Sequence, residues 1–339
     1  MYNILPESEN PLSIIKNDFD FRNTKSLKRC VESIIPEGKE EAKYYLISLG
    51  HGAGFGFFKT EALVTTIEEI PFVEGCSICY KSATDFEILW NIEFFKAFSG
   101  IKFELAIFNN CQMTLFENCV LFSRFITYFI ATENYLALEM LNLKSMLETL
   151  IVRIKVKQSP ENIGQIVYDN YLQSILKRIS ENSLNSDDTS LFYINLENYN
   201  DFFHKFEEII GEILDLVDKN PDWIKEIRNK LPYIEATLPL IDFVEFLKSL
   251  QQDNFITISI KKMINDLLDS IEESMISKWA RKSRKKLNGI SLYFPPTDRL
   301  RYDEIYIFNR NLLCSEEILK PSNWDRLLDK VLFNPQNNP

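Results

Sequence analysis

The sequence predicts an α/β fold built on a mostly parallel sheet. Three short apolar runs, at residues 44–49, 103–108 and 127–132, have the length and composition of buried strands. Amphipathic segments lie between and around them, and strands that alternate with helices are typical of a parallel sheet covered on both faces. The chain has 339 residues, 45% of them hydrophobic and 26% charged, so it can bury a core large enough for one or two domains.

The first hundred residues supply one strand and two helices of this pattern. A helix is expected from Thr24 to Ile35, because its apolar residues recur at helical spacing and Pro36 follows. The run Tyr44–Leu49 is expected to be a buried strand that ends in a turn at His51-Gly52. A capping box predicts a helix from Ser82 to Phe98. The secondary structure of residues 63–70 stays open.

The second strand leads into a segment with reactive side chains. It covers Phe103–Phe108 and ends at Asn109-Asn110-Cys111. An amphipathic helix over residues 115–125 is expected next, and the third strand, Thr127–Thr132, follows it. These segments continue the alternation of strand and helix.

The remainder of the chain is mainly helical. The helical pattern runs from about Leu141 to Met275, with a polar loop at 182–189. Gly289–Phe294 is expected to be a strand, and Tyr306–Phe308 is a candidate for another. We therefore divide the chain into a core with the His and Cys strands (1–150), a mainly helical region (151–285), and a C-terminal strand and helix that return to the core (286–339).

The charge of the chain argues against nucleic acid or a membrane as a partner. The net charge is −11, and an acidic body repels phosphate at long range. The basic run Lys278–Lys286 is interpreted as a solvated helix face or an exposed loop. The longest apolar stretch, Cys119–Ala131, is too short to cross a bilayer, and residues 1–12 do not read as a signal peptide. We expect a cytoplasmic protein, unless a leader has been removed.

The cysteines do not suggest a disulfide framework or a metal site. Six cysteines are scattered over a long chain, whereas disulfide frameworks belong to short, cysteine-dense domains. Cys76 and Cys79 have the spacing of a zinc or redox motif, but no second pair follows and the chain has only two histidines. We expect no bound metal.

Two reactive residues follow equivalent strand ends. His51 comes after the first predicted strand and Cys111 after the second. The carboxyl ends of parallel strands meet at one edge of a sheet, so the two residues become neighbours if their strands do. A His beside a Cys favours the thiolate and can move the proton to a leaving amine, and the Gly52 N–H can approach a substrate carbonyl. A lone His or Cys at such a place is usually structural. Their joint occurrence favours nucleophilic catalysis.

Six segments of the chain resemble the clostripain-type (C11 family) cysteine peptidases, relatives of caspases, gingipains and legumain. They follow the order of the family and together cover roughly residues 24–333. The segments are YYLISLGHGAGFGFF, FELAIFNNCQMTLFENCVLF, TYFIATEN, LPLIDFVEFLKSL, GISLYFPP and SNWDRLLDKVLF.

The resemblance implies a caspase-like three-layer α/β/α sandwich with a large helical insertion. It implies that His51 is the general acid and base and that Cys111 is the nucleophile of a Cys/His dyad. The N–H groups of Gly52 and Cys111 would form the oxyanion hole. The reaction would be hydrolysis of a peptide bond through an acyl-enzyme, with a protein or peptide as substrate.

The chain departs from the family pattern at the positions that select the substrate. Relatives often carry Asp two residues before the Cys, and this position is Asn109 here. Glu133 and Glu139 are two candidates for the family's second acid, although an acid after a strand is usually just solvated. An amide lacks the charge that pairs with Arg or Lys, so only a weak preference for a basic P1 residue is expected. Asp242 either holds a loop or faces the P1 pocket, and His204 is expected to be structural.

Three functions remain open from the sequence. The first is a regulated intracellular endopeptidase with a dedicated protein substrate or an activating partner protein. The second is a catalytically inactive peptidase fold that acts as a binding or regulatory subunit, favoured by the absence of a counterpart to the family's first strand before Tyr44. The third is a subunit of a larger assembly that uses residues 150–275 as its interface. No cofactor is expected. Some family members depend on calcium, but no EF-hand-like loop supports this here.

Overall fold

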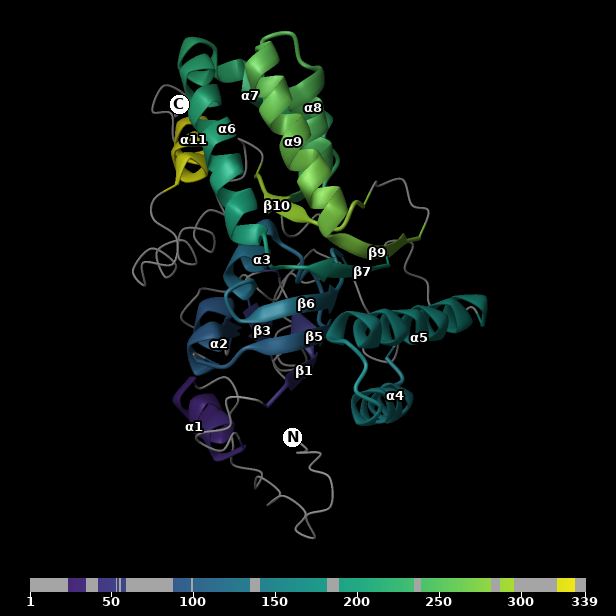
Figure 1. Ribbon diagram of the computed structural model, residues 1–339. Helices are drawn as coiled ribbons and strands as arrows, with labels where there is room; N and C mark the ends of the chain where they lie inside the picture. Colours follow the sequence, from purple (N-terminus) through teal and green to yellow (C-terminus); the bar gives the residue numbers. More distant parts are fainter. Residues whose placement is uncertain are drawn as a thin grey trace, which may run out of the picture.

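The computed structural model describes residues 24–34, 42–52, 54, 56–58, 88–98, 100–134, 141–181, 189–234, 239–281, 287–295 and 322–332. At its centre is a sheet of five strands in the order β1-β5-β6-β7-β9 (Figure 1). The strands β1, β5 and β6 are parallel, and β7 and β9 extend the sheet in antiparallel fashion. Their bounds are Tyr44–Leu49, Phe103–Asn109, Ile126–Ala131, Ser190–Asn195 and Met275–Ala280.

Helices cover both faces of this sheet, and alternate side chains of its strands point toward the two helical layers. Residues such as Ala106 and Phe108 of β5 join a core with α1, α2 and α3, whereas Leu105 and Ile107 face the core under α4 and α5. The structure therefore has the three-layer α/β/α fold that the sequence predicts. The helices are α1 (Thr24–Ile34), α2 (Asn91–Ala97), α3 (Phe116–Phe122), α4 (Leu143–Lys155) and α5 (Pro160–Ser180).

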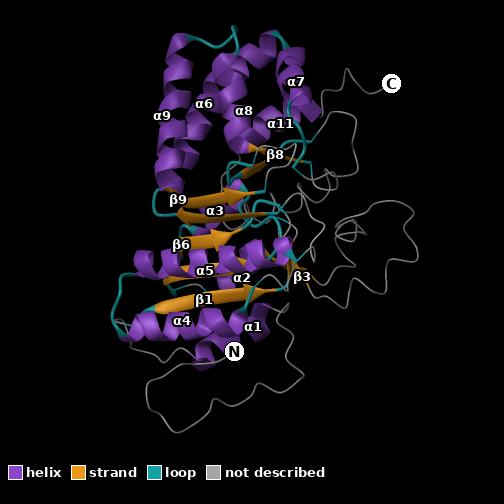
Figure 2. Cartoon of the chain, turned by 90° about the vertical axis from the view of Figure 1, so that its right-hand side faces the viewer, coloured by secondary structure: helices purple, strands orange, loops and turns teal. Residues whose placement is uncertain are grey.

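The remaining helices gather beyond the β9 end of the sheet (Figures 1 and 2). They are α6 (Tyr199–Lys219), α7 (Pro221–Lys230), α8 (Phe243–Gln252), α9 (Ile258–Ser274) and α11 (Asn323–Leu332). Beside them lies a two-stranded sheet in which β8 (Leu240–Asp242) and β10 (Ser291–Tyr293) are antiparallel to each other. A single bridge from Leu115 to Ser291 connects this small sheet to the segment after β5.

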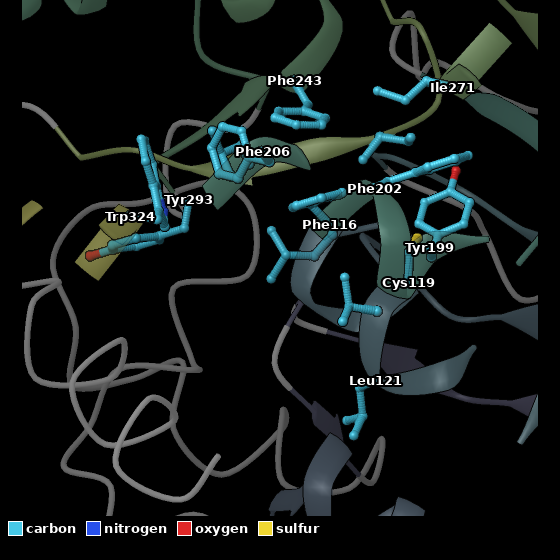
Figure 3. Packing of buried hydrophobic residues seen from close by; sticks show 14 of the residues in the cluster. Phe116, Cys119, Leu121, Tyr199, Phe202, Phe206, Phe243, Ile271, Tyr293 and Trp324 are labelled. Carbon is cyan, nitrogen blue, oxygen red and sulfur yellow. The ribbon is translucent and has the colours of Figure 1, made fainter. Parts of the chain in front are cut away.

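Aromatic packing joins α3 of the sheet layer to the helical region. The Phe116 ring stacks on Phe243 with 4.4 Å between centroids, and it meets Phe206 edge to face at 5.5 Å (Figure 3). These rings come from α3, α8 and α6, and all three are buried. The sheet layer and the helical region thus share one continuous core, although the boundaries that we drew at 150 and 285 stay a prediction.

A third, small sheet follows β1 directly. It contains β2 (His51–Gly52), β3 (Gly56–Phe58) and β4 (Ile88–Trp90), all antiparallel. The sequence predicted a turn at His51-Gly52, and the structure instead pairs these two residues with β3. The helix predicted over Ser82–Phe98 is wrong at Ile88–Trp90, because pairing with β3 overrides the helical spacing. The helix that follows these residues begins at Asn91, and positions 82–87 of the prediction lie outside the described residues.

Two strands interrupt the mainly helical region predicted from about Leu141 to Met275. Both β7 and β8 lie inside this stretch, because a short apolar run in a helical region cannot be told from a buried helix by periodicity. The basic run also begins differently from the prediction. Lys278 belongs to strand β9, where its ammonium pairs with Glu272 at 2.5 Å.

The other strands agree closely with the predicted runs. The first strand is confirmed at Tyr44–Leu49, and β5, β6 and β10 overlap the runs at 103–108, 127–132 and 289–294. The predictions for 63–70, 182–188 and 306–308, and Cys76 with Cys79, lie outside the described residues. None of the described helices combines the length and the apolar composition needed to cross a bilayer.

Candidate active site

The register of β1 against β5 brings the two predicted catalytic segments together. The strands are parallel neighbours, and Leu49 is paired with Asn109 at their last position. The Gly50 N–H donates to the Asn109 carbonyl over 3.4 Å just beyond this pair. The backbone of His51 and that of Cys111 therefore leave the sheet at the same edge, each two residues after the last paired position. Only the backbone of His51 is described.

Gly52 lies directly against the backbone of Cys111. A Cβ at residue 52 would be 2.4 Å from the Cys111 carbonyl oxygen and 3.0 Å from its nitrogen. Real Cβ atoms do not come this close to backbone, so the contact requires glycine. The residue that follows the predicted base thus touches the predicted nucleophile.

The Cys111 segment forms a sharp turn that is tied to β6. Gln112 has a φ of 59°, in the left-handed region that non-glycine residues seldom adopt. The Gln112 N–H donates to the Asn134 carbonyl at 2.9 Å, and the Met113 N–H donates to the Thr132 carbonyl at 3.0 Å. These bonds hold the strained turn in place, as is common at functional sites.

The described cysteines differ in their access to solvent. Cys111 is 9% exposed, whereas Cys119 on α3 is fully buried. Burial, together with the nearby Glu117 and Glu133 carboxyls, raises the pKa of the Cys119 thiol far above its ordinary value. Cys119 is therefore a structural thiol of the core.

Tyr171 on α5 reaches the strand end from the opposite layer. Its hydroxyl donates a hydrogen bond to the Asn109 Oδ1 atom, and both side chains are buried. Burial, and to a smaller extent the nearby Cys111, raise the pKa of Tyr171 well above its ordinary value, so its hydroxyl stays a neutral donor. No sequence pattern pointed to Tyr171, because a tyrosine on a helix face is usually a core residue.

Glu133 and Asp242 form a buried carboxyl pair behind the site. The Glu133 Oε2 accepts from the Gly289 N–H at 2.8 Å, and the Asp242 Oδ2 accepts from the Asn288 N–H at 2.6 Å. Burial and the charge of Asp242 raise the pKa of Glu133 well above its ordinary value, and burial raises the pKa of Asp242 to about 6. The pair therefore keeps a proton to higher pH than isolated carboxyl groups do.

The structure thus places the predicted specificity residues in different settings. Asn109 contacts Tyr171, Glu133 contacts the loop before β10, and Glu139 lies outside the described residues. Their role in substrate binding stays a prediction. Asp242 caps α8 through the Glu245 N–H and holds the loop at Asn288, which is one of its two predicted roles. His204 is on the exposed face of α6, with its ring 3.3 Å from the Asn200 amide.

Two buried asparagines, neither of which was predicted from the sequence, lie beside the His51 segment. Asn91 and Asn118 donate to the Gly54 carbonyl at 2.7 and 2.5 Å. Their partner is 37 and 64 residues away in the chain, so no local pattern points to them. Among the described residues, no group of three or more His, Cys, Asp or Glu side chains is arranged to hold a metal ion.

Comparison with solved structures identifies similar folds. An inactive zymogen of a C11 protease from Parabacteroides distasonis superimposes with a TM-score of 0.58 at 13% identity, covering 91% of this chain and 80% of that one. A secreted C11 cysteine protease from Bacteroides thetaiotaomicron, "iotapain", gives 0.53 at 13% identity, covering 92% and 78%. Such a secreted protease in complex with an irreversible peptide inhibitor gives 0.53 at 12% identity, covering 88% and 78%.

The similarity is one of fold. No family model matches the sequence, and no curated protein matches it. At 12–13% identity the solved structures establish the caspase-like α/β architecture of the chain, with a sheet flanked by helices as in the C11 proteases.

Proposed function

We propose that this chain is a cysteine peptidase that hydrolyses peptide bonds through Cys111 and His51. The observation that carries the proposal is the register of β1 and β5, which ends at the pair Leu49–Asn109 and brings both segments to one sheet edge. The contact of Gly52 with the Cys111 backbone supports it. The likeness in fold to C11 proteases supports a protease-like architecture.

The proposed reaction passes through a thioester. His51 takes the proton of the Cys111 thiol, and the Cys111 Sγ attacks the carbonyl carbon of the scissile bond while the electron pair of that carbonyl moves to its oxygen. As the C–N bond breaks, His51 gives its proton to the leaving amine, and an acyl-enzyme remains. His51 then takes a proton from water, the hydroxide attacks the thioester, and Cys111 leaves as thiolate.

Backbone N–H groups are proposed to stabilise the oxyanion. Those of Gly52 and Cys111 are the candidates, because these two residues touch and an oxyanion hole needs two fixed donors. Donors of this kind are already oriented when the negative charge develops, so they lower the barrier without reorganisation.

The proposed substrate is a peptide or protein. One of the similar proteases was solved with a peptide inhibitor, which is consistent with this class. We propose a weak preference for a basic P1 residue, with Asn109, Glu133 and Glu139 as the residues that contact it. The missing carboxylate at Asn109 is the reason that the preference is weak.

We further propose that the enzyme works in the cytoplasm on a dedicated protein substrate or together with an activating partner. The six cysteines are scattered over a long chain, a usage that differs from the cysteine-dense short domains of oxidising compartments. A protease there needs restraint, because uncontrolled proteolysis is harmful. The net charge of −11 disfavours nucleic acid or an anionic membrane as a partner.

Intact-mass measurement tests the proposal. The chain is incubated with peptide acyloxymethyl ketones that carry Arg, Lys, Asp or Leu at P1. A single adduct is expected on the wild type and on Cys119→Ala, and no adduct on Cys111→Ala. The peptide that reacts identifies the P1 preference. An adduct that persists in Cys111→Ala, or appears only at another cysteine, contradicts the dyad.

A latent or inactive peptidase fold is the second candidate. Two observations favour it, the low exposure of Cys111 and the engagement of Asn109 by Tyr171 inside the protein. The first similar structure is itself described as an inactive zymogen. This candidate predicts no adduct with any of the four peptides, together with a folded chain by circular dichroism.

A further inference from the structure

The Asn118 side chain joins the two loops of the proposed site. Its amide Nδ2 donates to the Gly54 carbonyl at 2.5 Å and to the Met113 carbonyl at 3.3 Å. Gly54 lies three residues after His51, and Met113 lies two residues after Cys111. One NH₂ group thus spans from the His51 loop to the Cys111 loop.

A second asparagine fixes the orientation of this amide. The Asn91 Nδ2 donates to the Asn118 Oδ1 at 2.7 Å and to the Gly54 carbonyl at 2.7 Å. The Asn118 oxygen therefore faces Asn91, and its NH₂ group must face the two carbonyls. The two asparagines come from α2 and α3, which are packed against each other.

Burial makes the arrangement difficult to replace by solvent. Asn91 is 2% exposed and Asn118 is 3% exposed. Loss of the Asn118 amide leaves the Gly54 carbonyl with the Asn91 amide alone, whereas the Met113 carbonyl loses its side-chain donor and moves toward another donor or toward solvent. Either movement displaces the loop that carries it.

We infer that Asn118 is a positioning residue that sets the placement of the His51 loop relative to the Cys111 loop. It touches neither the substrate nor the reacting atoms, and it acts through the Gly54 and Met113 carbonyls. Gly52 precedes Gly54 by two residues and touches the Cys111 backbone, so the bonds of Asn118 also hold the proposed oxyanion donors together. The inference deepens the proposed function and rests on it.

The pH dependence of Cys111 alkylation is the decisive measurement. A Cys paired with a His forms thiolate well below the pKa of a free thiol, which is about 8.5. In Asn118→Ala we expect the midpoint of iodoacetamide alkylation to rise toward this value. Labelling by the reactive peptide ketone should slow about 100-fold, because a misplacement near 1 Å can cost that much. Asn118→Asp, which keeps the shape but offers no donor, should behave alike.

Two further variants keep the test decisive. Asn91→Ala leaves the Asn118 amide present but loosely oriented, so we expect an intermediate shift. If Asn118→Ala does not fold, Asn91→Ala and Asn118→Ser give the answer. Asn323→Ala is the matched control, because the Asn323 amide also donates to a backbone carbonyl, that of Glu207 at 2.9 Å, at the α6–α11 contact. It should change stability without changing the pH midpoint.

Hydrogen exchange separates failure of the inference from failure of the proposed function. In Asn118→Ala the amides of Gly52 and Met113 should exchange faster, whether or not the chain is a peptidase. Folded Asn118 variants with wild-type exchange, labelling rate and pH midpoint overturn the inference. Absence of Cys111-dependent labelling in the wild type overturns the proposed function, and the exchange data then decide the inference alone.

Discussion

Gly52 and Cys111 are in backbone contact at the edge of the sheet, where a Cβ on residue 52 would approach the Cys111 carbonyl oxygen to 2.4 Å. The obstruction is backbone, which cannot rotate away as a side chain can. Any residue larger than glycine must therefore move β2 away from the end of β5.

Gly52→Ala should inactivate the protein while leaving it folded. The methyl group separates the two proposed oxyanion donors, and loss of one such donor typically lowers the rate about 100-fold or more. The rate of labelling by the reactive peptide ketone measures this. Gly100→Ala serves as control, because no atom lies within 4 Å of its Cβ and only its φ of +88° is strained. Equal labelling of both variants would contradict the proposed geometry.

Glu133→Gln should reduce the pH dependence of stability. The pKa of Glu133 is raised well above its ordinary value by burial and by Asp242, so the folded state keeps a proton that the unfolded state releases above about pH 4.3. The unfolded state then binds fewer protons, and wild-type stability falls as the pH rises above that value. Glutamine has no proton to lose.

Thermal unfolding between pH 5 and pH 8 checks this expectation. The wild type should lose more of its melting temperature over this range than Glu133→Gln, and the variant should be the more stable of the two at pH 8. Glu226→Gln, at an exposed position on α7, should follow the wild type. If the melting temperatures of Glu133→Gln and the wild type change equally with pH, Glu133 is ionised in the folded protein.

Tyr171→Phe should both destabilise the chain and change the alkylation of Cys111 by iodoacetamide. It removes the hydroxyl that donates to buried Asn109, which costs about 1 kcal/mol in the free energy of unfolding. Urea unfolding measures the loss, and iodoacetamide alkylation reports on the thiol nearby. Tyr193→Phe is the control, since its hydroxyl donates to the Glu161 carbonyl at 2.9 Å. Tyr193→Phe should lower the free energy of unfolding without changing the alkylation of Cys111. If Tyr171→Phe also leaves the alkylation of Cys111 unchanged, Tyr171 has no role at this thiol.

Phe116→Ala should unfold the sheet layer and the helical region together. The ring packs on Phe243 and Phe206 in the shared core, and truncation of such a residue costs about 3–5 kcal/mol. One cooperative transition at lower urea is expected by both fluorescence and circular dichroism. Ile258→Ala, at a side chain 89% exposed, should shift it very little. Two separate transitions would mean that the regions fold independently.

The sheet edge with the site was predictable because its strands are short and clearly bounded. Tyr44–Leu49 and Phe103–Asn109 are mostly apolar, too short for a typical helix and followed by polar residues, which favours buried strands. The apolar run of β7, Ser190–Asn195, has the same character but sits between long helical patterns. Its strand state comes from pairing with β6 and β9, which a single sequence does not contain.

The supports of the site were not predictable for a related reason. A catalytic His or Cys is chemically distinctive wherever it stands, whereas Asn118 and Tyr171 are ordinary residues for a helix. Their roles arise from partners at Gly54 and Asn109, which are 64 and 62 residues away. Only the folded chain brings these pairs together. Sequence reasoning therefore finds the reacting groups more readily than the residues that hold them.

The pairing of β6 with β7 has a consequence for a chain cut between α5 and β7. The strands share register from Tyr128–Asn195 to Ala131–Phe192, and α5 packs on both. A single break there would yield two polypeptides that stay associated through the hydrogen bonds between β6 and β7. Gel filtration would show no change, while a denaturing gel would show two bands. A nicked form of this protein would thus behave as a noncovalent heterodimer whose subunits meet inside one sheet.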